Sequence, residues 1–199
     1  MIVYLGMPRC ASSWLYNHLA NGIKETHYLY TNPVDVENYS KNQLLDFSTN
    51  NWSMDSDIAQ LVDKYTKHYI FIFRDPVELA KSYKVILENT QTLEEFVQYQ
   101  TITKLLCYGD IIERWYNLVD PAKILIYDYA DVGTNDFLLD IAKETGLTVE
   151  EYNNTIVNAS NLTLDETISN DLLDLLKYQV SKLEKITKRP FRFQINNLL

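Results

Sequence analysis

The chain begins MIVYLGMPRCASSW, and this segment decides the fold because it joins a buried strand to a helix. Residues Ile2 to Leu5 form an apolar run that ends at Gly6, which is typical of a strand in a covered parallel sheet. Residues Ser12 to Ala20 follow with the leucine spacing of a helix. Such a joint can bind phosphate through backbone N–H groups and the positive end of the helix dipole.

Apolar strands and amphipathic helices alternate along the rest of the chain. Buried strands are expected at Tyr69 to Phe73 (YIFIF) and at Lys123 to Tyr127 (KILIY). We expect residues 24–30 to be extended and the polar residues 31–53 to form a long loop. Helices are expected over residues 58–65, 76–87, 93–106, 111–118, 137–144 and 172–183. This order predicts a three-layer, P-loop-like α/β fold with a central, mostly parallel sheet flanked by helices.

Length and composition limit the class of protein. The 199 residues predict a single domain over residues 1–199. A hydrophobic content of 46% with 13% aromatic residues excludes a mainly disordered chain. Cys10 and Cys107 have neither metal-site nor disulfide spacing, so we expect reduced thiols, no metal and a cytoplasmic location.

The charge balance limits the partners. A net charge of −9 repels polyanions, so we expect no nucleic-acid partner, and an anion site must be a local basic pocket. No stretch reaches the roughly 18 apolar residues of a membrane span. No basic segment precedes an apolar run at the start, so we expect no signal peptide.

The loop after the first strand differs from the Walker A pattern G-x-x-x-x-G-K-[ST]. Aligned on Gly6, Ala11 stands in place of the second glycine and Ser12 in place of the lysine. The cation of this loop is instead Arg9, three residues before Ser12. This disfavours an ordinary P-loop kinase or GTPase. A simple strand–turn–helix joint with a serine N-cap is the structural alternative.

A second polar segment follows the YIFIF strand. Arg74 comes directly after that strand, and Ser82 lies eight residues further on, within a helix that Asp75 and Pro76 are expected to begin. An arginine fork and a hydroxyl group can together bind a phosphate. The alternative is that Arg74 pairs with Asp75 or Glu78 and that Ser82 faces solvent.

Together these segments resemble the two signatures of the PAPS-dependent sulfotransferases. The first family signature is a P-[KR]-x-G-[TS]-[TS]-[WL]-like loop after the first strand, and residues 8–14 (PRCASSW) are similar to it. The second begins with an arginine at a strand end and has a serine eight residues later, as Arg74 and Ser82 do. Two motifs in this order and strand context are far more specific than either alone.

Two further stretches extend the resemblance to about residues 2–147. Residues 24–30 (KETHYLY) are similar to an E-x-H-F-F-like segment of the heparan-type and bacterial members. Arg114-Trp115 followed by residues 124–132 (ILIYDYADV) is similar to the family stretch RW…ILVLRYEDL.

The resemblance implies a reaction and its co-substrate. A sulfuryl group passes from PAPS (3′-phosphoadenosine 5′-phosphosulfate) to a hydroxyl or amine of a small-molecule or carbohydrate acceptor, and PAP leaves. Arg9 is the implied cation beside the leaving 5′-phosphate, and Arg74 and Ser82 are implied to hold the 3′-phosphate. The implied cofactor-binding residues are Arg9, Cys10, Ala11, Ser12, Ser13, Trp14, Arg74 and Ser82.

The acceptor needs a general base, and the resemblance places it at Glu25 with His27 beside it. On an extended segment these two residues point to the same face. The alternative is that Glu25 pairs with Lys24 and His27 packs. Two roles are open for the Trp14 side chain: it stacks on the adenine of the nucleotide, or it packs in the core of the protein.

Ala11 departs from the family pattern, which has glycine at that position. We expect Ala11 to have a negative φ in the first helical turn, with its N–H toward the anion site. The departure keeps a non-catalytic nucleotide-binding module open beside the enzyme. A kinase-like P-loop protein is the third possibility.

Overall fold

The computed structural model of the chain describes residues 1–19, 22–23, 29, 35–149 and 168–197. They group into two compact units, each built from two segments of the chain. Unit 1 comprises Met1–Phe73 and Tyr116–Asn158, and unit 2 comprises Arg74–Trp115 and Ala159–Leu199. The single domain expected over residues 1–199 stays a prediction.

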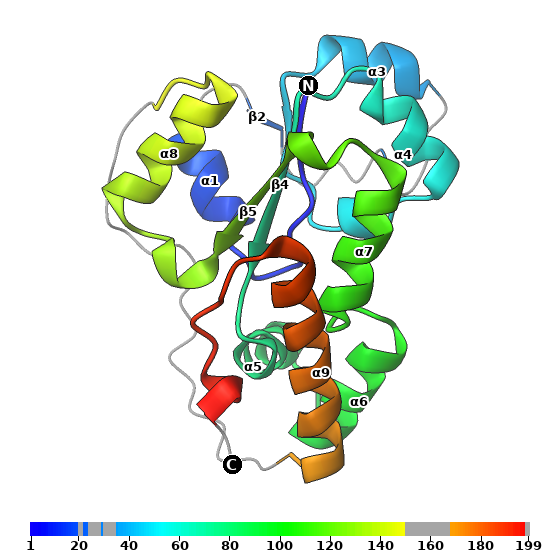
Figure 1. Cartoon of the computed structure of the whole chain (residues 1–199), viewed down its shortest axis with the longest axis vertical. Helices are drawn as coiled ribbons and strands as arrows, with labels where there is room; N and C mark the ends of the chain where they lie inside the picture. Colours follow the sequence, from blue (N-terminus) through cyan, green and yellow to red (C-terminus); the bar gives the residue numbers. More distant parts are fainter. Residues whose placement is uncertain (20–21, 24–28, 30–34, 150–167, 198–199) are drawn as a thin grey trace. The chain divides into compact units, whose positions relative to one another are not determined.

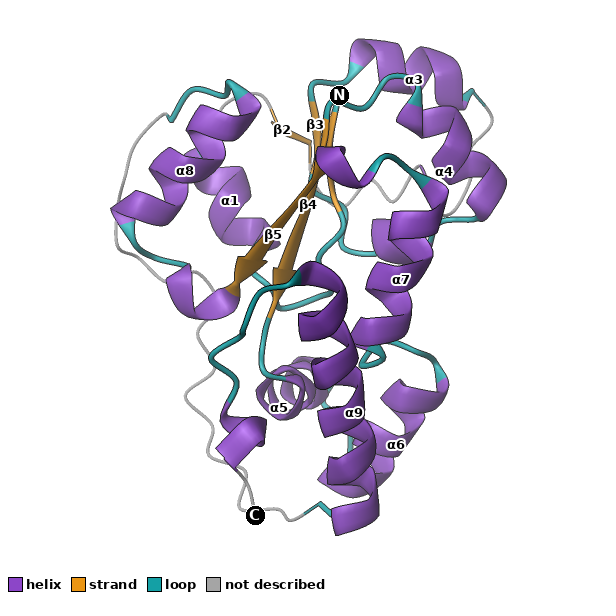
Figure 2. Ribbon diagram, viewed as in Figure 1, coloured by secondary structure: helices purple, strands orange, loops and turns teal. Residues whose placement is uncertain are grey.

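Unit 1 is organised around a parallel sheet of five strands (Figure 2). The strands are β1 (Ile2–Tyr4), β2 (Gly22–Ile23), β3 (Leu45–Asp46), β4 (His68–Phe73) and β5 (Ile124–Asp128). Their order is β2-β3-β1-β4-β5, so β1 lies in the middle, with Val3 opposite Asp46 on one side and Tyr69 on the other. Every pairing between these named strands is parallel, which confirms the predicted α/β class.

Helices cover both faces of this sheet, which gives unit 1 the three predicted layers. Figure 1 shows α1 and α8 on one side of the strands, and α3 and α4 on the other. Phe137 of α8 packs against Trp14 of α1 and Tyr127 of β5, with ring centroids 5.8 and 5.1 Å apart. The helices of unit 1 are α1 (Ser12–His18), α3 (Val36–Asn42), α4 (Ser56–Asp63) and α8 (Asn135–Thr145).

Strand β4 forms the centre of the core of unit 1. Each side chain from Tyr69 to Phe73 is fully buried, because helices exclude water from both faces of the sheet. A strand buried on both faces needs a continuous apolar run, as the YIFIF sequence supplies. Burial raises the pKa of the Tyr69 phenol far above its ordinary value, so this hydroxyl stays protonated.

The described part of unit 2 is helical. Its helices are α5 (Pro76–Ile86), α6 (Leu93–Ile102), α7 (Tyr108–Leu118, whose last residues belong to unit 1), α9 (Asn170–Thr187) and the 3₁₀ helix η4 (Gln194–Asn197). Helix α9 buries Leu176, Val180 and Leu183, which confirms the predicted apolar stripe. Lys182 on the same helix bonds to Asp110 of α7 at 2.7 Å, so polar contacts add to the apolar packing of this pair.

The loop predicted over residues 31–53 is wrong for the described residues 35–53, which contain α3, β3 and the 3₁₀ helix η1 (Asn51–Ser53). Helix α3 is polar, and local contacts explain why it forms. The Asp35 carboxylate caps it by accepting the Asn38 N–H at 3.0 Å. Buried Asp46 of β3 accepts the Tyr39 hydroxyl at 2.7 Å, which ties the helix to the strand.

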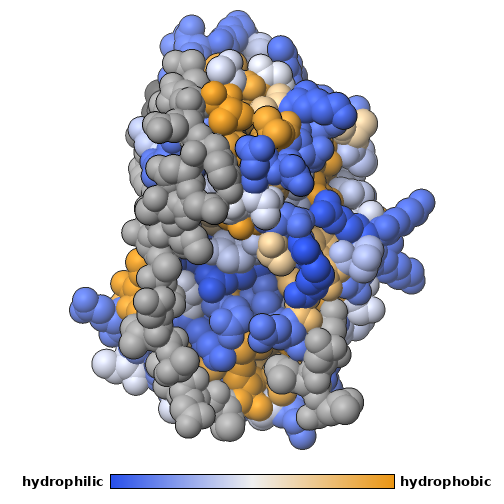
Figure 3. Space-filling model, turned by 90° about the vertical axis from the view of Figure 1, so that its left-hand side faces the viewer, coloured by the Kyte–Doolittle hydropathy of each residue, from blue (hydrophilic) through white to orange (hydrophobic). Residues whose placement is uncertain are grey.

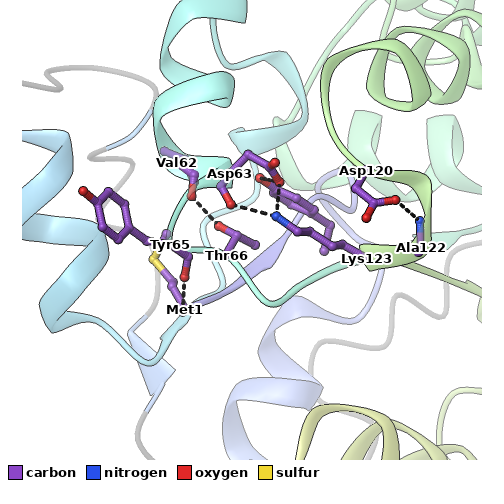
Figure 4. A network of polar contacts seen from close by, with 9 residues as sticks. Met1, Val62, Asp63, Tyr65, Thr66, Asp120, Ala122 and Lys123 are labelled. Atoms are coloured by element: carbon purple, nitrogen blue, oxygen red, sulfur yellow. Dashed lines mark hydrogen bonds and ion pairs between the residues drawn. The ribbon is translucent and has the colours of Figure 1, made fainter.

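A polar network links residues of unit 1 that lie at the edge of the sheet where the strands begin (Figure 4). The Lys123 ammonium, just before β5, donates to the main-chain and side-chain oxygens of Asp63 at 2.8 and 2.9 Å. The Met1 ammonium donates to the Tyr65 carbonyl at 2.6 Å, and partial burial lowers its pKa. These contacts hold the turn after α4 against the edge of the sheet where the strands begin. The β1–α1 loop lies at the other edge, where the strands end.

Hydrophilic side chains cover most of the described surface on the face drawn in Figure 3, where hydrophobic ones form small patches. None of the helices in the described part of the chain has the length and hydropathy that a membrane crossing requires.

Candidate functional site

The first candidate binding segment is the loop between β1 and α1, in unit 1. It follows the middle strand at the carboxyl edge of the sheet, where ligands of open α/β sheets bind. The loop turns tightly, with the Cys10 N–H donating to the Met7 carbonyl at 3.3 Å. Arg9 is partly exposed in this turn, whereas the Cys10 side chain is fully buried.

Helix α1 begins without a side-chain cap. Its N-cap residue is Ala11, which has no side-chain oxygen, so the alternative of a serine N-cap is wrong. Ser12 and Ser13 instead occupy the first helical positions, Ser12 almost buried and Ser13 partly exposed. The first N–H groups of the helix therefore have no capping side chain from the N-cap position.

The expected conformation of Ala11 is also wrong. Its φ is 71° and its ψ 13°, in the left-handed region, and Ala11 precedes the helix instead of forming its first turn. Arg9 has a φ of 69°, so two non-glycine residues of one loop are left-handed. Each costs about 1–2 kcal/mol relative to an ordinary backbone conformation. The sequence showed that position 11 has alanine where the family pattern has glycine. It could not show that Ala11 would adopt the left-handed conformation that glycine favours.

Replacing Ala11 by glycine is therefore expected to stabilise the protein. Relief of the left-handed strain outweighs the greater freedom of glycine in the unfolded chain by roughly 0.5–1 kcal/mol. The melting temperature should rise by about 1–4 °C in a thermal unfolding experiment. The control is Ala142→Gly inside α8, which should lower the stability by about 1 kcal/mol. A lower melting temperature for Ala11→Gly would contradict the strain assignment.

The Trp14 ring lies in the core of unit 1. It is 4% exposed and stacks on His18 with ring centroids 4.2 Å apart, while Phe137 approaches it from α8. The His18 Nδ1 atom in turn lies 2.7 Å from the Trp14 carbonyl oxygen. The indole packs α1 against α8, so we propose no stacking of Trp14 on the adenine.

The second candidate binding segment is the start of α5, in unit 2. The Asp75 carboxylate accepts the N–H groups of Val77 and Glu78 at 2.9 and 3.0 Å, and Pro76 is the first helical residue. The predicted N-cap and the helix N1 proline are both confirmed. The other carboxylate oxygen of Asp75 accepts the N–H of Ile195 at 2.9 Å.

Arg74 and Ser82 lie on this well-fixed segment. The Arg74 side chain is partly exposed, and its carbonyl accepts the Tyr108 hydroxyl at 2.8 Å. Ser82 is 3% exposed, so the alternative in which it simply faces solvent is wrong. Glu78 forms its ion pair with Lys81 at 3.1 Å. Sequence reasoning missed Tyr108 because nothing near it in the chain indicates a partner 34 residues away.

The remaining predicted residues divide by where they fall. Glu25 and His27 lie outside the described residues. Lys188, followed by the basic residue Arg189, is the C-cap of α9 and has a left-handed φ of 54°. In the ranges that the structure describes, no group of three or more His, Cys, Asp or Glu residues could hold a metal ion.

A solved structure shares this fold. The crystal structure of a sulfotransferase from Alicyclobacillus acidocaldarius matches with a TM-score of 0.66 and 12% sequence identity, over 95% of this chain and 96% of that one. The crystal structure of mouse sulfotransferase SULT7A1 complexed with PAP matches with a TM-score of 0.48 and 12% identity, over 92% of this chain and 66% of that one. No family model and no curated protein matches the sequence.

The class that follows is an α/β protein with the sulfotransferase fold. More particularly, the likeness to the bacterial sulfotransferase extends over nearly the whole length of both chains.

Proposed function

We propose that this protein is a sulfotransferase that moves a sulfuryl group from PAPS to a hydroxyl or amine of a small-molecule or carbohydrate acceptor. The observation that carries the proposal is the β1–α1 loop, which places Arg9 and two serines after the middle strand of a sulfotransferase fold. The motif of residues 8–14 and the Arg74–Ser82 spacing support it.

The proposed reaction needs little covalent chemistry from the protein. The acceptor oxygen or nitrogen attacks sulfur, the bond from sulfur to the 5′-phosphate oxygen breaks, and the acceptor proton passes to Glu25. Negative charge grows on the leaving phosphate, where the guanidinium of Arg9 and the loop N–H groups stabilise it. The product that leaves is PAP.

The proposal assigns the binding of the nucleotide to two segments of the chain. The β1–α1 loop would bind the 5′-phosphosulfate, with Arg9, the N–H groups of residues 10–13 and the two serine hydroxyls as donors. Arg74 and Ser82 would bind the 3′-phosphate, and the cap of α5 fixes the segment that carries them. We also propose a cytoplasmic location, because neither Cys10 nor Cys107 forms a disulfide.

Thermal unfolding with nucleotides tests the proposal. PAP at 100 times its Kd should stabilise the protein by about 2.7 kcal/mol, which corresponds to roughly 5–11 °C for a chain of this size. ATP and GTP at the same concentration should have little effect, because they lack the 3′-phosphate. Stabilisation by ATP or GTP alone would favour the kinase-like alternative. No response to any nucleotide would contradict the proposal and also leave no support for a nucleotide-binding module.

A further inference from the structure

Tyr4 carries a polar hydroxyl group at the buried end of β1 in unit 1. It is the last residue of β1, its side chain is fully buried, and its ring packs near Phe47 at 6.2 Å between centroids. Its hydroxyl donates to the carbonyl oxygen of Cys10, in the middle of the β1–α1 loop. A buried phenol needs such a partner, and this one is a main-chain atom of the proposed phosphate loop.

This hydrogen bond sets the direction of the peptide between Cys10 and Ala11. The peptide is trans, so its C=O and N–H groups point in opposite directions. Because the Cys10 carbonyl points at the buried Tyr4 hydroxyl, the Ala11 N–H points away from it. Among the residues that the structure describes, no acceptor pairs with this N–H.

Gly6 provides the space for this arrangement. A Cβ atom added at Gly6 would overlap the hydroxyl end of the Tyr4 ring, including Cε2 at 2.8 Å. The first residue of the loop must therefore lack a side chain for the Tyr4 hydroxyl to reach Cys10. Cys10, which carries the bonded carbonyl, lies between Arg9 and Ala11, and both of these residues have a left-handed conformation that neither favours by itself.

We propose that Tyr4 is a positioning residue that holds the Cys10–Ala11 peptide with its N–H toward the 5′-phosphate of the nucleotide. The identity of the ligand rests on the proposed function. The role of Tyr4 in fixing the loop conformation does not. A glycine at position 11 would adopt the left-handed conformation without strain. In this chain position 11 is an alanine, and the hydrogen bond from Tyr4 keeps that residue in the left-handed conformation. The substitution to test is Tyr4→Phe, which removes only the hydroxyl.

The first measurement needs no nucleotide. Cys10 is buried within the loop, so its alkylation by iodoacetamide, followed by peptide mass spectrometry, reports loop opening. Tyr4→Phe should raise the alkylation rate of Cys10 at least fivefold. The rate at Cys107, in unit 2, should stay unchanged, and burial raises the pKa of this thiol, which keeps it slow. An unchanged Cys10 rate in Tyr4→Phe overturns the proposal whether or not the protein binds PAP.

The second measurement is the affinity for PAP. Without the hydroxyl, alanine should keep position 11 left-handed in only a small fraction of molecules, so the Kd should rise about 5- to 30-fold. In the Ala11→Gly background the same change should cost only about twofold, because glycine accepts this conformation freely. A purely structural role would give the same factor in both backgrounds, and that result would overturn the positioning role.

The matched control is Tyr69→Phe, which removes another buried tyrosine hydroxyl from the neighbouring strand. That hydroxyl donates to Asp63 at 3.2 Å, at the opposite edge of the sheet. Tyr69→Phe should leave both the Cys10 rate and the PAP affinity unchanged. If Tyr4→Phe does not fold, the double variant with Ala11→Gly carries the labelling test. Wild-type protein that fails to bind PAP contradicts the proposed function, while Cys10 labelling still decides the role of Tyr4.

Discussion

Glu25→Gln is expected to reduce turnover by about 10²–10⁴, the range for loss of a general base. Glutamine keeps the size and hydrogen-bonding reach of the side chain but cannot take the proton of the acceptor. The thermal shift with PAP should stay at its wild-type value, because the base does not hold the nucleotide. The measurement is sulfuryl transfer from labelled PAPS, with kcat and the PAP affinity determined on the same preparation.

Glu37→Gln is the control for this experiment. Glu37 is an exposed carboxylate of unit 1 that pairs with Lys41 at 2.7 Å, and this pair lowers its pKa. Its replacement should leave turnover within a few-fold of wild type. If Glu25→Gln also stays within a few-fold, Glu25 is not the base, and His27→Ala becomes the next variant to test.

Arg74→Ala should weaken PAP binding about 10- to 150-fold. The guanidinium would form charge-assisted hydrogen bonds to the 3′-phosphate, and their loss corresponds to roughly 1.5–3 kcal/mol. Isothermal titration with PAP measures the change. The affinity of Arg74→Lys for PAP should lie between those of the wild type and Arg74→Ala, because lysine keeps the charge but loses the bidentate hydrogen-bonding geometry of arginine.

Lys81→Ala is the matched control, on the helix that follows Arg74. Lys81 also carries a positive charge, but it lies on α5 and pairs with Glu78. Its loss should change the affinity for PAP less than twofold. A folded Arg74→Ala protein that binds PAP as tightly as wild type would sink the assignment of the 3′-phosphate site.

The sequence was sufficient where a strong pattern and a local rule agreed. The YIFIF run of β4, the Asp75–Pro76 start of α5 and the stripe of α9 all appear as predicted, because each depends on neighbours in the chain. The two-residue strands β2 and β3 were missed because they are too short to show alternation. Helix α3 was missed because its polar sequence hides the cap at Asp35.

In the candidate site, the residue types could be predicted but not their conformations. The motif identified Arg9 and Ala11 as loop residues, yet the sign of φ depends on the surrounding fold and not on composition. A signal for Tyr4 did exist, since a tyrosine in an otherwise apolar buried strand requires a partner for its hydroxyl. Only the structure shows that this partner is the Cys10 carbonyl.

The two oxygens of the Asp75 carboxylate acquire their hydrogen-bond partners at different times while the chain is synthesised. One of its oxygens is satisfied as soon as α5 forms, whereas the other waits for the N–H of Ile195, 120 residues later. At about 5–20 residues per second a ribosome needs on the order of 10 s to cover that distance. Unit 1 needs no residue beyond Asn158, whereas unit 2 combines Arg74–Trp115 with the later segment Ala159–Leu199. The helix that follows Arg74 and carries Ser82 can therefore begin to form early, but the hydrogen bonds of its Asp75 cap are complete only after Ile195 has been made.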